Sequence, residues 1–509
     1  MLRWCISAER SFLLVLGRGP SLETCHSCSG PRSPKSLRKL ALKYGGLMYL
    51  QLGQKPCLVV STAAAAKEIF RKHDATFASR PPTLAFNILT AGAYRNLGYA
   101  PYGPFWRRLR RIANTQLFSP AVHASHEPIR RKEIHYMLKV LVEDSHKGKP
   151  IHLKSWLTSV TANNMTMMLS NKRIFEMGVD NDEKKRDFDE MLRRTFVVNG
   201  DFMICDYVPY LSFVTKLQGW VSEMQGLRAL GASLVGNIFQ VDEHRERAQK
   251  MYPSDTDYVP DYIDVLLKTS LDDGDRLPDR DIVSLVVGLL NAGTDASANT
   301  VEWAMAELMA NPDIRKKAQA ELDAVVQDRL VQESDIPNLP FLQAIVKENY
   351  RMHPSAPLSV RHESHESCVI SGCEFPAHTE LIVNIFAIHR DPSVYENPDK
   401  FDPTRFVRSP EVDPVAGNDF YQLMPFGAGR RMCPEQQLGN TMVTSMLANL
   451  LQCFEWETAT SERESGGGEG DAVVVDMVDY YSFMSFRQKP LCLLAKPRPL
   501  ASLLLQASP

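Results

Sequence analysis

The sequence lacks any apolar run long enough to cross a bilayer, which takes about 20 consecutive apolar residues in a helix. The most apolar stretch near its start is only "FLLVL", residues 12–16. Residues 1–35 are rich in Ser, Arg and Gly and end in the turn-rich "SGPRSPKS". We interpret them as a leader or hinge without a clear membrane anchor, either a transit peptide or a wrongly assigned first exon.

Cysteine is also sparse, with 10 in 509 residues, which excludes a disulfide scaffold. Cys25 and Cys28 form a CxxC motif, but no second pair follows at zinc spacing. Ser29 stands where covalent haem attachment would need a histidine. We therefore interpret this pair as two reduced thiols.

An excess of charge of either sign is missing as well. The chain has 58 Lys and Arg against 60 Asp and Glu, so nucleic acid is not an expected partner. Charged residues make up 23% and hydrophobic residues 44%, as in globular proteins. There is no internal repeat and no linker after the leader. We expect one large domain over residues 36–499 and a short tail over residues 500–509.

The periodicity predicts a mainly α fold with small β-sheets. Two short strands, "LMYLQLG" and "KPCLVVS", precede a helix that Thr62 caps, and residues 104–330 are mostly helical. Strand-like segments return later in the chain: "CVISGCEFP", "ELIVNIFAIH", "AVVVDMV" and "PLCLLAKP".

One predicted helix, over residues 279–312, is apolar on nearly every side in its first half, which is typical of a helix buried all round. Its middle nevertheless contains Gly293, Thr294, Asp295 and Ser297, and polar groups of this kind are costly in an ordinary core. We interpret it as a central helix with a functional interruption.

The segment "PFGAGRRMCPEQQLG" places Cys433 between a glycine-rich basic turn and the start of a helix. Gly427 and Gly429 permit a tight turn, and free amide groups at a helix start favour a thiolate, as do Arg430 and Arg431. A shielded thiolate is what an axial ligand to haem iron requires.

This segment resembles the haem-binding loop of the cytochrome P450 family, Phe-x-x-Gly-x-Arg-x-Cys-x-Gly, and further runs resemble the plant microsomal type. Phe426, Gly429, Arg431 and Cys433 match the pattern, whereas Glu435 replaces its last glycine. A glutamate there either points to solvent or benefits from the helix N-terminus. Its charge beside a thiolate would lower the iron potential, so we interpret it as a liability.

The resemblance implies haem b with Cys433 as the axial iron ligand. It also implies that Trp106 and Arg110 of "YGPFWRRLRR", Arg431, and His362 of "VRHES" reach the haem propionates. Three further residues would form a structural network behind the loop: Glu348, Arg351 and Arg405.

By the same resemblance, "AGTDAS" over residues 292–297 is the oxygen-activating segment. Gly293 would open the helix, and Asp295 would be the acid of a proton relay that also includes Thr294 and Ser297. Ala296 replaces the family threonine, and Ser297 lies about 100° further round the helix. The relay is therefore altered, or rebuilt through water or a substrate hydroxyl.

Position along the chain suggests an apolar pocket that excludes a highly charged substrate. We expect it to be lined by Phe86, Leu89, Leu289, Ala292, Ala356, Leu358, Val360, Phe483 and Met484.

These features predict a haem-thiolate monooxygenase that inserts one oxygen atom from O2 into a small apolar metabolite. The resemblance implies electrons from NADPH through an FAD/FMN flavoprotein reductase, and a location on the cytosolic face of the endoplasmic reticulum. The lack of an anchor leaves a plastid or soluble location as the alternative. Ala296 and Glu435 leave two other hypotheses open: a reductase-independent hydroperoxide isomerase or dehydratase, and a non-catalytic ligand-binding protein.

Overall fold

The structure is a computed structural model of the whole chain. It describes residues 14–15, 33–90, 95–176, 183–201, 203–239, 243–246, 261–269, 276–415, 419–459, 475–502 and 504. The CxxC pair and most of the leader lie outside these residues, as does most of the tail.

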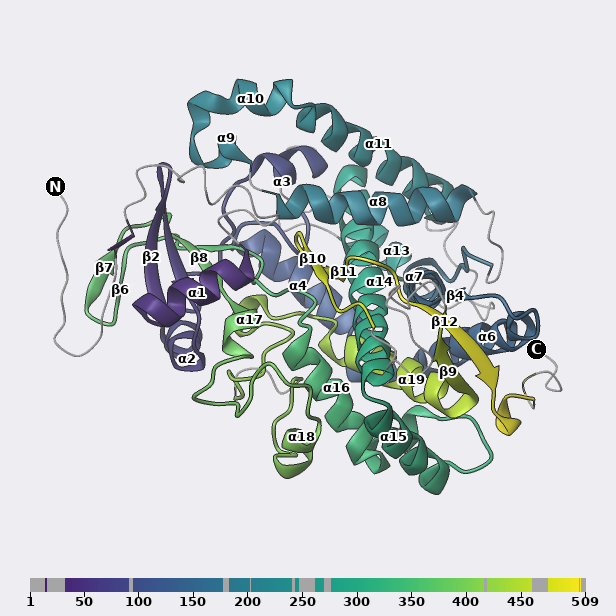
Figure 1. Cartoon of the computed structure of the whole chain (residues 1–509). Helices are drawn as coiled ribbons and strands as arrows, with labels where there is room; N and C mark the ends of the chain where they lie inside the picture. Colours follow the sequence, from purple (N-terminus) through teal and green to yellow (C-terminus); the bar gives the residue numbers. More distant parts are fainter. Residues whose placement is uncertain are drawn as a thin grey trace.

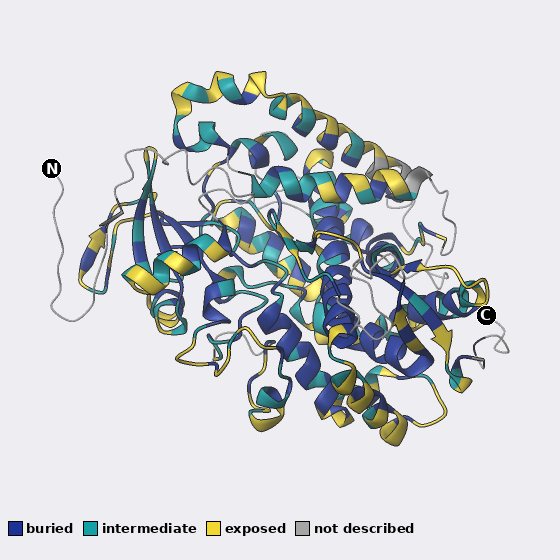
Figure 2. Ribbon diagram, viewed as in Figure 1, coloured by how far each residue is buried: buried dark blue, intermediate teal, exposed yellow. Residues whose placement is uncertain are grey.

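A 32-residue helix, α14 (Asp279–Ala310), runs through the middle of the molecule, as the sequence predicts (Figure 1). Asp279 and Asp281 in its first turn favour this start, because acidic groups are stabilised at a helix N-terminus. It packs against α7 (Leu153–Ser170), α16 (Pro340–Met352) and α19 (Gln436–Cys453). Figure 2 shows these helices largely buried, so the most apolar helices form the centre.

Other helices surround this centre. Three of them, α8 (Glu183–Gly200), α10 (Ser212–Leu217) and α11 (Trp220–Phe239), lie together along one side of the molecule (Figure 1). Further helices are α3 (Leu84–Leu89), α4 (Pro104–Gln116), α5 (Pro120–Ser125), α6 (Glu127–Ser145), α9 (Ile204–Tyr207), α13 (Tyr262–Lys268), α15 (Pro312–Val325) and α18 (Thr404–Arg408).

The largest sheet forms a separate lobe with α1 (Pro34–Tyr44) and α2 (Ala63–Lys72) beside it (Figure 1). Its strand order is β1-β2-β3-β8-β5, with bounds Leu14–Val15, Leu47–Leu52, Lys55–Val60, Glu380–Val383 and His362–Glu363. Thr62 caps α2 by accepting a hydrogen bond from the Ala65 amide at 3.4 Å, which confirms the predicted helix start.

Three small sheets account for the remaining strands. Their members are β4 (Ile151–His152), β12 (Cys492–Pro497) and β9 (Phe454–Thr458); β6 (Cys368–Ile370) and β7 (Cys373–Phe375); β10 (Asp479–Tyr481) and β11 (Ser485–Arg487).

Two strand predictions are wrong in part. "IFAIH" continues β8 as the short helix α17 (Ile385–Ile388), because the Asn384 side chain accepts a hydrogen bond from the Ala387 amide and caps it. In "AVVVDMV", residues 475–478 form no strand, and β10 begins only at Asp479. A β-branched run becomes a strand only where a partner strand is available.

The fold confirms a mainly α class in one domain. The main hydrophobic cluster extends from α6 and α7 across α14 to α16 and α19. In the part of the chain that the structure describes, no helix is long and apolar enough to cross a membrane.

Candidate functional site

The Cys433 loop is held by its own backbone. Gly427 and Gly429 adopt positive φ angles of 75° and 71°, which favour glycine. The short 3-10 helix η4 (Gly429–Arg431) follows, and the Cys433 amide then donates to the Phe426 carbonyl at 2.9 Å. The loop therefore presents Cys433 just before α19, as the glycine spacing predicts.

The environment of the Cys433 thiol sets its protonation. Its side chain is partly accessible, yet burial raises the pKa of the thiol to about 12, and the nearby Glu435 carboxyl raises it further. A backbone hydrogen bond from Glu435 and the charge of Arg110 act in the opposite direction. The thiol is thus protonated at neutral pH unless a cation replaces its proton.

Arg431 is a largely covered cation with no acidic partner among the described residues. Its Nε and Nη2 donate to the carbonyls of Ala78 and Ala100, both at 2.6 Å, and its guanidinium lies 4.1 Å from the Trp106 ring. The third nitrogen, Nη1, is buried and has no hydrogen-bond partner. Burial, together with the charges of Arg80 and Arg110, lowers the pKa of Arg431 to about 8.

The other predicted propionate ligands lie around Arg431. Arg110 is on α4, where desolvation lowers its pKa. Trp106 is buried and donates its indole N–H to the Leu97 carbonyl at 3.0 Å. His362 Nδ1 donates to the Phe77 carbonyl at 2.9 Å, and burial holds its pKa well below the usual value.

Arg80 is a cation of this cluster that the sequence reasoning missed. Its Nε donates to the Gly98 carbonyl at 3.1 Å, and its Nη1 donates to the Val360 and Arg361 carbonyls, both at 2.8 Å. Burial lowers its pKa to about 10. The one available signal was an arginine directly after the apolar "TFAS". No described carboxylate forms an ion pair with Arg80, Arg110 or Arg431.

One face of α14 is accessible in the middle of the helix. Ala292 is exposed and Ala296 is half-buried, although this part of α14 is otherwise enclosed by helices (Figure 2). The two residues are four apart and therefore share a helix face. This face carries no hydroxyl at position 296.

Asp295 is directed into an ion pair instead. Lys154 Nζ lies 2.5 Å from Asp295 Oδ1 and 3.4 Å from the Asp295 carbonyl. Asp189 is close enough that burial, with a contribution from Asp295, raises its pKa to about 6. The Thr294 hydroxyl is fully buried and has no hydrogen-bond partner.

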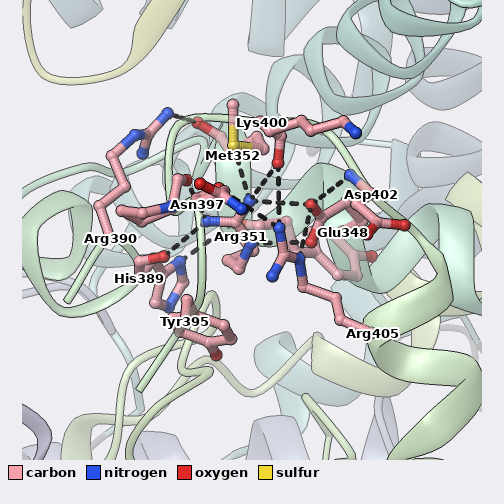
Figure 3. Close-up of polar contacts among 12 residues, drawn as sticks. Glu348, Arg351, Met352, His389, Arg390, Tyr395, Asn397, Lys400, Asp402 and Arg405 are labelled. Atoms are coloured by element: carbon pink, nitrogen blue, oxygen red, sulfur yellow. Dashed lines mark hydrogen bonds and ion pairs between the residues drawn. The ribbon is translucent and has the colours of Figure 1, made fainter. Parts of the chain in front are cut away.

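Figure 3 shows the predicted structural network, in which Arg351 and Arg405 point toward Glu348. Arg351 donates to both oxygens of Glu348, at 2.7 and 2.8 Å. Arg405 Nε and the Asp402 amide also donate to Glu348, at 3.1 and 2.7 Å. Glu348 and Arg351 are fully buried and their charges are matched.

The predicted pocket residues differ in their solvent exposure. Phe86 is buried and stacks on Tyr99 with ring centroids 3.6 Å apart. Leu289 and Met484 are buried, Leu358 packs under the large sheet, and Phe483 stacks near Phe196. The remaining members are only partly covered: Leu89, Ala356 and Val360.

Comparison with known proteins identifies the chain's relatives. The Cytochrome P450 family model matches residues 13–474. A flavonoid 3'-monooxygenase of Petunia hybrida is 37% identical over 92% of this chain and 89% of its own length. A Petunia hybrida flavonoid 3',5'-hydroxylase is 38% identical over 83% and 81%, and an Arabidopsis thaliana flavonoid 3'-monooxygenase is 38% identical over 92% and 88%.

A solved structure of a zebrafish cytochrome P450 with progesterone has the same fold. It superposes with a TM-score of 0.73 at 20% sequence identity, and the match covers 91% of this chain and 99% of that chain.

Proposed function

The chain belongs to the cytochrome P450 family and is a monooxygenase, and on this premise we propose that it inserts one oxygen atom from O2 into a small, largely apolar plant metabolite of the flavonoid class. The substrate class is supported by relatives at 37–38% identity over most of the chain. The accessible Ala292–Ala296 face supports an apolar rather than a charged substrate.

Family membership implies haem, and the described residues fit it. The observation that carries the proposal is a group of guanidinium ions near Cys433 that has no described carboxylate partner, in which the buried Arg431 Nη1 makes no hydrogen bond. Such a group suits the two carboxylates of a haem. Cys433 would hold the iron, Arg80, Arg110, Arg431 and His362 would face the propionates, and Phe426 and Gly429 would shape the loop.

When bound, haem supplies the oxygen-activating chemistry, for which thiolate ligation is favourable. The chain's own residues position that chemistry. Ala292 and Ala296 leave room for substrate and water along α14. The Asp295 carboxylate is held by Lys154 at 2.5 Å beside this face, with Thr294 and Ser297 as neighbouring hydroxyls.

The family uses O2 and a redox partner, and we infer here an NADPH-dependent FAD/FMN reductase at the endoplasmic reticulum. Arg107 and Arg111 are exposed on α4, the helix that also carries Arg110. An exposed basic helix next to the Cys433 loop suits an acidic protein partner.

The first test is a carbon-monoxide difference spectrum of the reduced recombinant protein, followed by turnover of a flavonoid panel with NADPH and reductase. A thiolate-type Soret band and NADPH-dependent products carrying one added oxygen atom are expected. A band without any product from the panel would refute the substrate class. No band would refute haem-thiolate binding.

The absence of a hydroxyl at Ala296 favours a second candidate function, that of a hydroperoxide isomerase or dehydratase. Such an enzyme would convert a fatty-acid hydroperoxide without NADPH or reductase. Turnover of that substrate by the isolated protein, with no flavonoid oxidation, would favour it over the monooxygenase. Substrate-induced spectral shifts without either product would favour the non-catalytic protein.

A further inference from the structure

Three helices meet beside the haem loop, and side chains from all three line a small cavity. Asn164 comes from α7, Gly293 and Ser297 come from α14, and Glu435 is the N-cap residue of α19. The cavity has a volume of about 10 Å³. This is close to the space that one water molecule needs.

The polar groups around this cavity have unused hydrogen-bonding capacity. Asn164 is 2% exposed, its side-chain oxygen has no partner, and its amide nitrogen reaches only the Met168 sulfur at 3.6 Å. The Glu435 carboxyl, 8% exposed, makes no hydrogen bond or ion pair with any described residue. The Ser297 hydroxyl also makes no hydrogen bond with any described residue. Buried polar groups of this kind are normally bridged by protein or by water.

Gly293 makes room for the Glu435 side chain. A Cβ atom at Gly293 would lie 2.8 Å from Glu435 Oε2 and 2.7 Å from the Met165 sulfur, so the ends of these two side chains would have to move to accommodate it. Ser297 lies four residues later on the same helix face. This face is distinct from the accessible Ala292–Ala296 face. Glu435 is therefore directed into the junction of α7, α14 and α19.

We propose that one water molecule occupies this cavity and bridges the Glu435 carboxyl, the Asn164 side-chain amide and the Ser297 hydroxyl. Water donates and accepts, so the bridge forms whether or not the carboxyl carries a proton. The bridge holds the Glu435 carboxyl against Gly293, so Asn164 acts as a positioning residue for Glu435. It explains how the chain accommodates a glutamate where the family pattern has glycine.

This inference goes beyond the proposed function, since it holds for any substrate. A double-mutant cycle with Asn164→Leu and Glu435→Gly tests it, with the rate of haem transfer to an acceptor globin and the unfolding of the haem-free protein in urea as readouts. In the presence of Glu435, we expect Asn164→Leu to speed haem loss about 10-fold and to raise the unfolding equilibrium constant by a similar factor, since a buried carboxyl loses its bridge. In the Glu435→Gly background, we expect a change of no more than about 2-fold.

Thr166→Ala is the matched control on the same helix. Thr166 is fully buried, but its hydroxyl donates to the Asn163 carbonyl at 3.1 Å and does not line the cavity. Its effect should be the same in both backgrounds. An equal effect of Asn164→Leu in both backgrounds would overturn the proposal.

A high-resolution crystal structure of the unmodified holoenzyme tests the bridge directly and needs no variant to fold. An ordered water within hydrogen-bond distance of Asn164, Ser297 and Glu435 is expected. A direct hydrogen bond between Glu435 and Asn164, or a Glu435 side chain turned out of the junction, would overturn it. Both results are independent of whether flavonoids are substrates.

Discussion

Two arginine clusters lie near the Cys433 loop, and they differ in one respect. In the first, the Glu348 carboxylate accepts hydrogen bonds from Arg351, Arg405 and the Asp402 amide, so both guanidinium ions have a carboxylate partner within the chain. In the second, the charges of Arg80 and Arg110 contribute to the lowered pKa of Arg431, and no described carboxylate pairs with these three arginines.

This difference indicates that unmatched charge, rather than buried charge, marks the ligand site. A matched ion network is a structural element. Removal of one partner leaves the other charge buried and uncompensated. An unmatched cluster carries a desolvation penalty that an anionic ligand can relieve. The first cluster should therefore control folding, and the second should control haem binding.

The largest expected effect comes from breaking the matched cluster. Glu348→Ala leaves the buried Arg351 and the partly buried Arg405 without their carboxylate partner, which costs about 3–5 kcal/mol of unfolding free energy. We expect little folded protein, measured by urea unfolding and circular dichroism. The control is Glu457→Ala, which removes an exposed ion pair with Lys496 and should cost less than about 1 kcal/mol. Similar losses in both variants would contradict the assignment.

Replacing the loop thiol should separate haem binding from folding. Cys433→Ser is expected to abolish the thiolate-type band in the carbon-monoxide difference spectrum. The unfolding free energy of the haem-free protein should change by less than about 1 kcal/mol, as for an isosteric substitution. Retention of the thiolate-type band would show that another cysteine binds the iron.

A smaller effect is expected from the unmatched cluster. Arg431→Met removes the guanidinium with the free Nη1, and haem affinity should fall about 10-fold to 100-fold, as for loss of a charge-assisted hydrogen bond. The haem-free protein should lose much less stability than with Glu348→Ala, because a repelled cation is removed. Haem titration and urea unfolding measure both quantities. A stability loss as large as that of Glu348→Ala, at unchanged haem affinity, would reverse the comparison.

The smallest effect concerns Asp189, which lies near the Asp295–Lys154 ion pair. Burial raises the pKa of Asp189 to about 6, above its unfolded value, so its contribution to stability is present at low pH and is lost as pH rises toward and through 6. Asp189→Asn should flatten this dependence by an amount on the order of 1 kcal/mol after allowance for solvent screening. Thermal unfolding between pH 4 and pH 7 measures it. Parallel pH profiles in the two proteins would contradict the shift.

Local patterns made part of this structure predictable. The glycine spacing predicts the turn before Cys433, the apolar run predicts α14, and Thr62 predicts the start of α2, because each depends on residues within a few turns of one another. The Glu348–Arg351 pair could be predicted for the same reason, because the two residues are three positions apart on one helix. The strand predicted within "AVVVDMV" is wrong for residues 475–478, because strand formation needs a partner that the segment does not contain.

The sequence alone determined the family, the mainly helical class and the cysteine that would bind iron. Only the tertiary structure decided that Arg80 joins Arg431, that Lys154 holds Asp295, and that Gly293 makes room for Glu435. The physical reason is separation along the chain. Arg431 donates to the Ala78 carbonyl across 353 positions of the sequence, and Lys154 reaches Asp295 across 141. These side chains therefore come into contact only after the helices have packed.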